Sequence, residues 1–349
     1  MSTKSKIVNF TIIILSIVVL LAYILFVDGI ENIMQIFLTI NPLWLLAGAG
    51  CMVIYWSIEG SILNRSVGFF RKKMTMRQSA KTCMIGQFFN CITPSSTGGQ
   101  AMQAYYMYRI DISVGFATSA LLIRFIVYQV TLTIYSSVVL LFKYQEFAAQ
   151  VAGFQYLILF GYCVNTTVAI MLLLIGFKKN IAYKIMHFIV RALAKLHIVK
   201  NLDKQLARVD EEVDMFHAGF STIKSHKKKL FVLFLMTVLQ LTFFFLVPVM
   251  VACSFGIAMS LSGVLTMIAG ASCVQMGSSF VPLPGSAGGA EISFYMLFGS
   301  YFASNQINSA ILLWRILTFY MPILVGMFFS RDVFGKRETS EEIETFLKD

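Results

Sequence analysis

The chain has 349 residues, of which 58% are hydrophobic and only 13% are charged. Soluble domains carry about 25% charged residues, so this composition excludes an ordinary water-soluble domain and indicates that much of the surface faces lipid. The formal net charge is +11. In a soluble protein this excess would suggest a nucleic-acid partner, but basic residues gathered on cytoplasmic segments explain it here, and we expect no nucleic acid.

Six apolar runs predict full membrane spans, since about 20 apolar residues cross a bilayer. A signal peptide is the alternative for the first run, but Phe26, Val27 and Asp28 follow it instead of a small-residue cleavage site. The sequence therefore predicts an all-α polytopic membrane protein. The six runs are 7–27, 42–63, 114–142, 154–177, 230–254 and 308–330.

The basic residues predict the orientation of these spans. Of the 28 Lys and Arg residues, 24 lie before residue 7, between 64 and 81, in 178–229 or after 330. Cytoplasmic loops are enriched in Lys and Arg. We therefore expect a multi-pass protein of the cell membrane whose two termini and whose segment 178–229 are cytoplasmic.

Two more apolar stretches, 82–108 and 258–300, remain. Spans 114–142 and 154–177 already return the chain to the cytoplasmic side, and so do spans 230–254 and 308–330. Neither of the two stretches can therefore add a net crossing. Each must enter and leave the membrane on one side, the first from inside and the second from outside. Both are broken by proline, which removes a backbone donor, and by a glycine pair, which can take positive φ. We therefore predict two re-entrant hairpins, with structural breaks at Pro94 and Pro284.

The two breaks belong to an internal repeat. The pattern Pro94-x-x-x-Gly98-Gly99 recurs 190 residues later as Pro284-x-x-x-Gly288-Gly289, and Leu-Leu-Ile-Arg124 resembles Leu-Leu-Trp-Arg315. Chance matching of apolar sequence is the alternative. Each unit, 42–142 and 230–330, would be a span, a re-entrant hairpin and a second span. Because the hairpins dip from opposite sides, the units would form an inverted repeat, which is typical of transporters.

Four charged residues lie inside apolar segments: Glu59, Arg124, Glu291 and Arg315. A charge near the bilayer centre costs about 2.5–3.5 kcal/mol on insertion scales, so such residues face a cavity or a partner. The guanidinium groups of Arg124 and Arg315 suit bidentate binding of a lipid phosphate. The alternative is a structural pair, Arg124 with Glu291 or Arg315 with Glu59, that joins the two halves. Glu59 is close to the end of its span and is predicted to extend to water.

Hydroxyl, amide and backbone N–H groups at the two breaks complete the candidate site. Such groups at a helix start can bind an anion, or they can instead satisfy the broken backbone itself. No catalytic residue, metal or cofactor is expected, because the sequence holds no P-loop, zinc-protease, hydrolase or dinucleotide motif. With the two arginines, the candidate binding residues are Ser96, Thr97, Gly98, Gly99, Gln100, Ser286, Gly288, Gly289 and Glu291.

The segment 178–229 is predicted to be helical and to lie on the membrane surface. Ile181, Ile185 and Phe188 share one helical face, opposite Lys184 and Arg191. A basic amphipathic helix of this kind binds an anionic leaflet. Apolar residues from 202 to 223 then recur at steps of four and three, which predicts a helical seam packed on a neighbour.

The motif around the first break, Ile85-Gly-Gln-Phe-Phe-Asn-Cys-Ile-Thr-Pro-Ser-Ser-Thr-Gly-Gly-Gln, and the second, Pro-Leu-Pro-Gly-Ser-Ala-Gly-Gly-Ala-Glu, resemble the transmembrane region of lysylphosphatidylglycerol synthases. The resemblance covers roughly residues 10–335 and includes stand-alone flippase-like proteins. The resemblance implies the fold of that region. It also implies translocation of aminoacylated phosphatidylglycerol, the activity implied for this region in the multiple peptide resistance factor, a protein linked to antibiotic resistance. This chain departs from the family's first turn, which often reads P-x-R-x-G-E and carries charge.

We therefore expect an integral membrane domain over 1–335, a cytoplasmic tail over 336–349, and a translocase (flippase) that moves a phospholipid or another lipid-linked anion between leaflets. The alternative implied by the family name is phosphatidylglycerol lysyltransferase. The soluble aminoacyltransferase domain is expected to be missing, which ranks that enzyme lower. A third hypothesis is a membrane scaffold that recruits a lipid-modifying enzyme through 178–229. The expected partners are membrane phospholipid and either a separate lipid-modifying enzyme or further copies of this chain.

Overall fold

The computed structural model describes residues 40–70, 73–93, 96, 98–150, 154–195, 226–278 and 283–334, and most residues between 201 and 217. The predicted first span, the break residue Pro94, Thr97 and the tail after 335 lie outside the described residues. Every regular element in the described part is helical. The prediction of an all-α protein is therefore confirmed.

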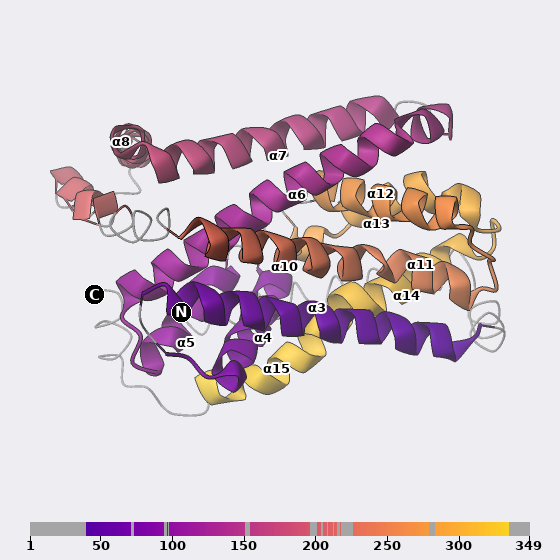
Figure 1. Ribbon diagram of the computed structural model, residues 1–349, viewed down its shortest axis with the longest axis horizontal. Helices are drawn as coiled ribbons and strands as arrows, with labels where there is room; N and C mark the ends of the chain where they lie inside the picture. The colour runs from indigo at the N-terminus through magenta and orange to yellow at the C-terminus, as the bar shows by residue number, and fades with distance from the viewer. Residues whose placement is uncertain are drawn as a thin grey trace.

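Long apolar helices form the bundle (Figure 1). Among the described residues, five helical segments are long and apolar enough to cross a membrane: Pro42–Gly68, Val114–Lys143, Lys227–Ser254, Leu261–Ser278 and Ile307–Ser330. The bent pair Gly161–Ile175 and Lys179–Ala192 would make a sixth if it is one span. Four of the five match predicted full spans. The fifth, Leu261–Ser278, belongs to the predicted second hairpin, and its length and composition also suit a full crossing. The prediction of a multi-pass membrane protein is confirmed, whereas the orientation of its termini stays a prediction.

The ends and bends of these helices follow from local sequence. Helix α3 (Pro42–Gly68) begins with Asn41, whose side chain accepts a hydrogen bond from the Leu43 N–H, and with Pro42 at its first position. Helices α10 (Lys227–Phe245) and α11 (Val247–Ser254) meet at Leu246, two residues before Pro248, which has no N–H to continue the helix. The last span consists of α14 (Ile307–Arg315), a π-helical turn (Ile316–Tyr320) and α15 (Met321–Phe334).

Each of the two predicted hairpins corresponds to a pair of helices. Helices α4 (Met76–Ile92) and α5 (Gly98–Arg109) pack against each other, as do α12 (Leu261–Ser278) and α13 (Gly289–Phe298). In Figure 1, α4 and α5 lie toward the left end of the bundle and α12 and α13 toward the right. The helices of the first pair end at Ile92 and begin again at Gly98, and those of the second end at Ser278 and begin again at Gly289. That the two units form an inverted repeat stays a prediction.

The first hairpin depends on glycine for its close packing. A Cβ on Gly99 would lie 2.7 Å from the backbone oxygen of Gly86 and would overlap the side chain of Asn90. Only a residue without a Cβ allows α5 to approach α4 this closely. At its other end α4 begins with a capping box, in which the Thr75 side chain accepts from the Gln78 N–H and Gln78 accepts from the Thr75 N–H.

The regular structure of the segment 178–229 is helical where the structure describes it. After α6 (Val114–Gln150) and α7 (Phe154–Phe177), α8 (Lys179–Lys195) turns away by 118°. Ala182 and Val190 of α8 pack against Val209 and Val213, so α8 is the neighbour of the predicted seam. Phe188 remains 73% exposed. Part of the apolar surface of α8 is thus covered by protein, and binding of the remainder to an anionic leaflet stays a prediction.

Polar contacts fix the same two segments to each other. The Lys179 ammonium lies 2.6 Å from Asp214, and the Tyr183 hydroxyl donates to the same carboxylate. These two hydrogen bonds lower the pKa of Asp214 from its ordinary value. His187 lies 2.6 Å from Asp210, one turn before Asp214.

Candidate functional site

A cavity of about 640 Å³ lies inside the bundle, and both predicted repeat units line it. The first unit contributes residues of α3, α4 and α6, and the second contributes residues of α10, α12, α14 and the turn before α13. Arg124 and Arg315, from α6 and α14, both line this cavity. The two predicted phosphate ligands therefore face one common space.

Arg124 is held by side chains of three neighbouring helices. Its Nη1 donates to Glu59 Oε1 of α3 at 3.1 Å and to Cys83 Sγ of α4 at 3.5 Å. Its Nη2 donates to Gln103 Oε1 of α5 at 2.9 Å. The other oxygen of Glu59 accepts from Gln87 Nε2 at 2.9 Å. A buried carboxylate and guanidinium thus satisfy each other, as hydrocarbon surroundings require.

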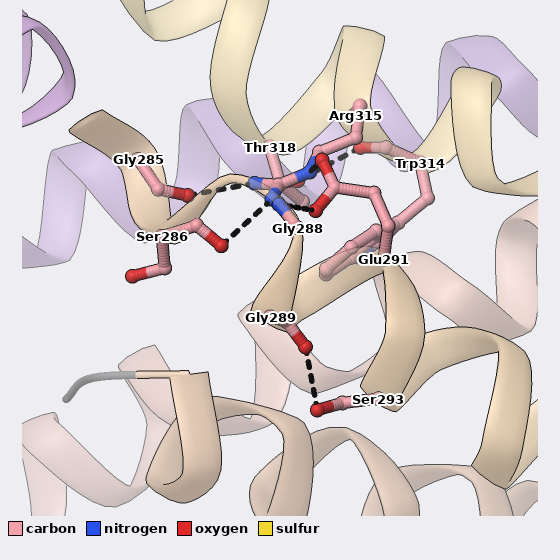
Figure 2. A network of polar contacts seen from close by, with 9 residues as sticks. All are labelled: Gly285, Ser286, Gly288, Gly289, Glu291, Ser293, Trp314, Arg315 and Thr318. Carbon is pink, nitrogen blue, oxygen red and sulfur yellow. Dashed lines mark hydrogen bonds and ion pairs between the residues drawn. The ribbon is translucent and has the colours of Figure 1, made fainter. Parts of the chain in front are cut away.

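Arg315 is held mainly by the second break (Figure 2). Its Nε donates to Glu291 Oε1 at 2.7 Å, its Nη1 to the Gly285 carbonyl at 3.0 Å, and its Nη2 to the Ser286 carbonyl at 3.5 Å. The guanidinium carbon also lies 5.2 Å from the ring centroid of Trp314, within the range of a cation–π contact. Arg315 therefore supplies hydrogen-bond donors to two backbone carbonyls of the turn Pro284–Ser286.

The predicted pairing between the two halves is wrong. Arg124 pairs with Glu59 and Arg315 pairs with Glu291, so each ion pair lies within one repeat unit. Glu59 also does not extend to water, because it is only 7% exposed. The rotation of α3 points Glu59 toward α4 and α6, where the charge of Arg124 and the amide of Gln87 compensate the cost of burial.

The break residues divide into two groups. Among the predicted binding residues that the structure describes, Arg124, Arg315, Ser96, Gln100 and Ser286 line the cavity. The residues outside its lining are Gly98, Gly99, Gly288, Gly289 and Glu291.

Two glycine N–H groups have protein partners. The Gly98 N–H donates to Thr93 Oγ1 at 2.9 Å, and the Gly288 N–H donates to Glu291 Oε2 at 2.7 Å. For these two groups the alternative prediction holds, since they satisfy the broken backbone. Gly285 and Gly288 also take positive φ, 59° and 83°, in and next to the turn Pro284–Ser286.

Ser96 and Ser286 share a backbone conformation that few residues other than glycine adopt. Their φ angles are 54° and 55°, both in the left-handed region. They are 190 residues apart, the same separation as the two proline–glycine motifs. Both line the cavity. Matching left-handed conformations at repeat-related positions of a shared cavity support the internal repeat.

Most of the polar cavity wall was not predicted from the sequence. The residues missed include hydroxyls, such as Tyr128 and Thr237, and six side-chain amides. Polar residues at membrane depth mark functional surfaces even without charge, so these positions were detectable in the sequence. The six amides are Gln87, Asn90, Gln129, Asn165, Gln240 and Gln275.

Comparisons with known proteins agree with this architecture. The profile of the family described as "Lysylphosphatidylglycerol synthase TM region" matches residues 13–326. A protein described as "UPF0104 membrane protein" from Archaeoglobus fulgidus is 23% identical over 276 residues, which cover 78% of this chain and 80% of the relative.

Proposed function

The chain belongs to the family of the lysylphosphatidylglycerol synthase transmembrane region, and we propose that it is a lipid translocase. Its substrate would be a phospholipid or another lipid-linked anion that crosses between leaflets through the cavity. The observation that carries this proposal is that Arg124 and Arg315 line one cavity inside a bundle of membrane helices. The family name supports a phospholipid as the substrate.

The physical requirement for such a translocase is a set of fixed donors for the phosphate. A charged headgroup that crosses hydrocarbon must exchange water for protein donors, because an isolated buried charge is very costly. Arginine stays protonated at any physiological pH, so its donors persist through a transport cycle. Without substrate, Glu59 and Glu291 compensate the two arginines. With substrate, the lipid phosphate would replace a carboxylate as the acceptor.

The lysyltransferase and scaffold alternatives gain no specific support from the described residues. The polar wall of the cavity consists of amides, arginines, hydroxyls and one carboxylate. Glu59, that carboxylate, is already bonded to Arg124 and Gln87. This lining suits binding of a polar group more than chemistry on it.

A translocation assay in proteoliposomes tests the proposal. Fluorescent phosphatidylglycerol in both leaflets would be quenched from outside, and the purified chain should increase the fraction that becomes accessible per unit time. Ala271→Phe should slow this exchange, because Ala271 lines the cavity and a larger side chain would fill it. Ala47→Phe is the matched control, since Ala47 of α3 is exposed on the outer surface. No acceleration over protein-free vesicles would contradict the proposal.

A further inference from the structure

Glu59 and Glu291 pair with the two arginines, but they differ in their relation to the cavity. Glu59 lines the cavity and is 7% exposed, whereas Glu291 lies outside its lining. Arg124 donates to Glu59 at 3.1 Å and Arg315 donates to Glu291 at 2.7 Å, so each pair is neutral before a ligand enters. An anion that binds at either arginine adds a negative charge to this neutral arrangement. In hydrocarbon surroundings that added charge needs compensation.

The two pairs would respond differently to an anion in the cavity. Arg315 donates from its two Nη atoms to backbone carbonyls of the turn and from its Nε to Glu291. A ligand at the Nη atoms of Arg315 would therefore compete with carbonyls. At Arg124, Nη1 donates to Glu59 itself. An anion that takes this donor from the cavity side separates Glu59 from its cation.

Glu59 depends on Arg124 for the compensation of its charge. Its titratable neighbours among the described residues of α3, α4 and α6 are Arg124, Tyr55, Cys83 and Tyr128. Phenols and thiols ordinarily keep their protons below about pH 8, so such neighbours add no charge. Gln87 Nε2 donates to the second oxygen of Glu59 at 2.9 Å, but one neutral amide does not compensate a full charge. A buried carboxylate that loses its cation takes up a proton instead of staying charged.

From this arrangement we infer that Glu59 is a proton-binding site, which takes up one proton when a lipid anion binds at Arg124 and releases it when the lipid leaves. This inference rests on the proposed function and adds an energy source to it. The carboxylate and a proton from the solution on the loading side form a neutral carboxylic acid, while Arg124 stays charged and pairs with the phosphate.

The consequence is a transport step that moves no net charge. The empty cavity holds one carboxylate against Arg124, and the loaded cavity holds one phosphodiester anion against Arg124 and a neutral Glu59. Loading thus adds one negative and one positive charge. The lipid and the proton cross together, and a proton gradient across the membrane would drive the lipid in the same direction.

A pH gradient across proteoliposomes tests this coupling. The purified full chain would be inserted into phosphatidylcholine vesicles with a trace of fluorescent phosphatidylglycerol, and valinomycin with equal potassium on both sides would remove the membrane potential. With the outside about one pH unit more acidic, the fluorescent lipid should accumulate in the inner leaflet, toward an excess of about tenfold, as one proton per lipid implies. The reversed gradient should reverse the excess. Protein-free vesicles under the same gradients supply the background.

A second measurement separates the proton from the charge. A membrane potential of about 100 mV without a pH gradient should leave the lipid evenly distributed, because the loaded and the empty cavity carry the same net charge. Glu59→Gln removes the proton-binding group, so it should abolish accumulation under the pH gradient and make the distribution respond to the potential. Glu211→Gln is the matched control, because Glu211 is exposed on the segment 178–229, and it should keep the response to the gradient.

The wild-type measurements do not depend on the folding of any variant. Exchange that the chain accelerates without an excess under either gradient would overturn the proton site and leave the translocase standing. So would accumulation driven by the potential alone, or accumulation under the pH gradient by Glu59→Gln. If the chain does not accelerate exchange over protein-free vesicles, the proposed function fails, and the proton site with it.

Discussion

The two arginine sites show how one chemical requirement is met in two ways. Arg124 and Arg315 lie in corresponding motifs of the two repeat units, and each has a carboxylate and further acceptors as partners. Glu59 comes from the preceding helix α3, whereas Glu291 comes from α13, directly after the break. A buried guanidinium needs compensation in either case, but the element that supplies it is free to differ.

The difference predicts different roles for the two residues. The partners of Arg124 are the side chains of Glu59, Cys83 and Gln103, which can change rotamer when a ligand competes for the guanidinium. Arg315 donates in addition to the backbone carbonyls of the turn, which cannot move without moving the turn. We therefore expect Arg315 to contribute more to stability.

Replacement of each arginine by alanine should show this contrast. Arg315→Ala leaves Glu291 without its cation and leaves the Gly285 carbonyl without its donor, and should cost about 3–5 kcal/mol of unfolding free energy. Arg124→Ala should cost less, because the partners of Arg124 are side chains that can change rotamer, whereas Arg315 also donates to two backbone carbonyls of the turn. Chemical denaturation in detergent micelles would measure both losses. Equal losses would contradict the division of roles.

A smaller effect is expected from alanine at the two glycines of the second turn. A Cβ on Gly285 would overlap the Phe319 ring at a φ of 59°, so Gly285→Ala combines backbone strain with steric overlap. We expect a loss of about 2–4 kcal/mol. Gly288→Ala is the matched control, with a φ of 83° and open space around the added Cβ, and should cost about 1–2 kcal/mol. Thermal unfolding would rank them, and a Gly288→Ala loss as large as that of Gly285→Ala would refute the overlap.

The smallest effect should come from the amide that holds Arg124. Gln103 is 1% exposed and accepts from Arg124 Nη2 at 2.9 Å. Gln103→Leu removes a hydrogen bond to a charged group and should cost about 1.5 kcal/mol. A double-mutant cycle with Arg124→Met measures their coupling, and zero coupling would show that the loss has another origin.

Periodicity, charge and the proline–glycine motifs predict the helices, both breaks and the importance of the two arginines. These features depend on local chain chemistry, such as the missing N–H of Pro284 or the length of an apolar run. The pairing of Glu59 with Arg124 could not be predicted, because it depends on the rotation of α3 relative to α6, across 65 residues of chain.

The amide wall was missed for a different reason. Gln240 and Asn165 lie in two different apolar helices, and only the packing of α7 and α10 around the cavity brings them to one place. Ser96 and Ser286 were singled out from the sequence for their hydroxyls, but their shared left-handed conformation is visible only in the folded turns. Sequence alone therefore locates the breaks better than it locates the surface that surrounds them.

The most direct test of the account is lipid translocation by the double variant Arg124→Lys, Arg315→Lys. Lysine keeps both charges but loses the two-pronged donor geometry that suits phosphate. In the phosphatidylglycerol vesicle assay, we expect the double variant to lose about tenfold or more in rate while it still elutes as a folded protein in size-exclusion chromatography. The single Arg124→Lys variant should account for most of this loss with little effect on stability. A wild-type rate in the folded double variant would contradict the assignment of the two arginines to the lipid phosphate.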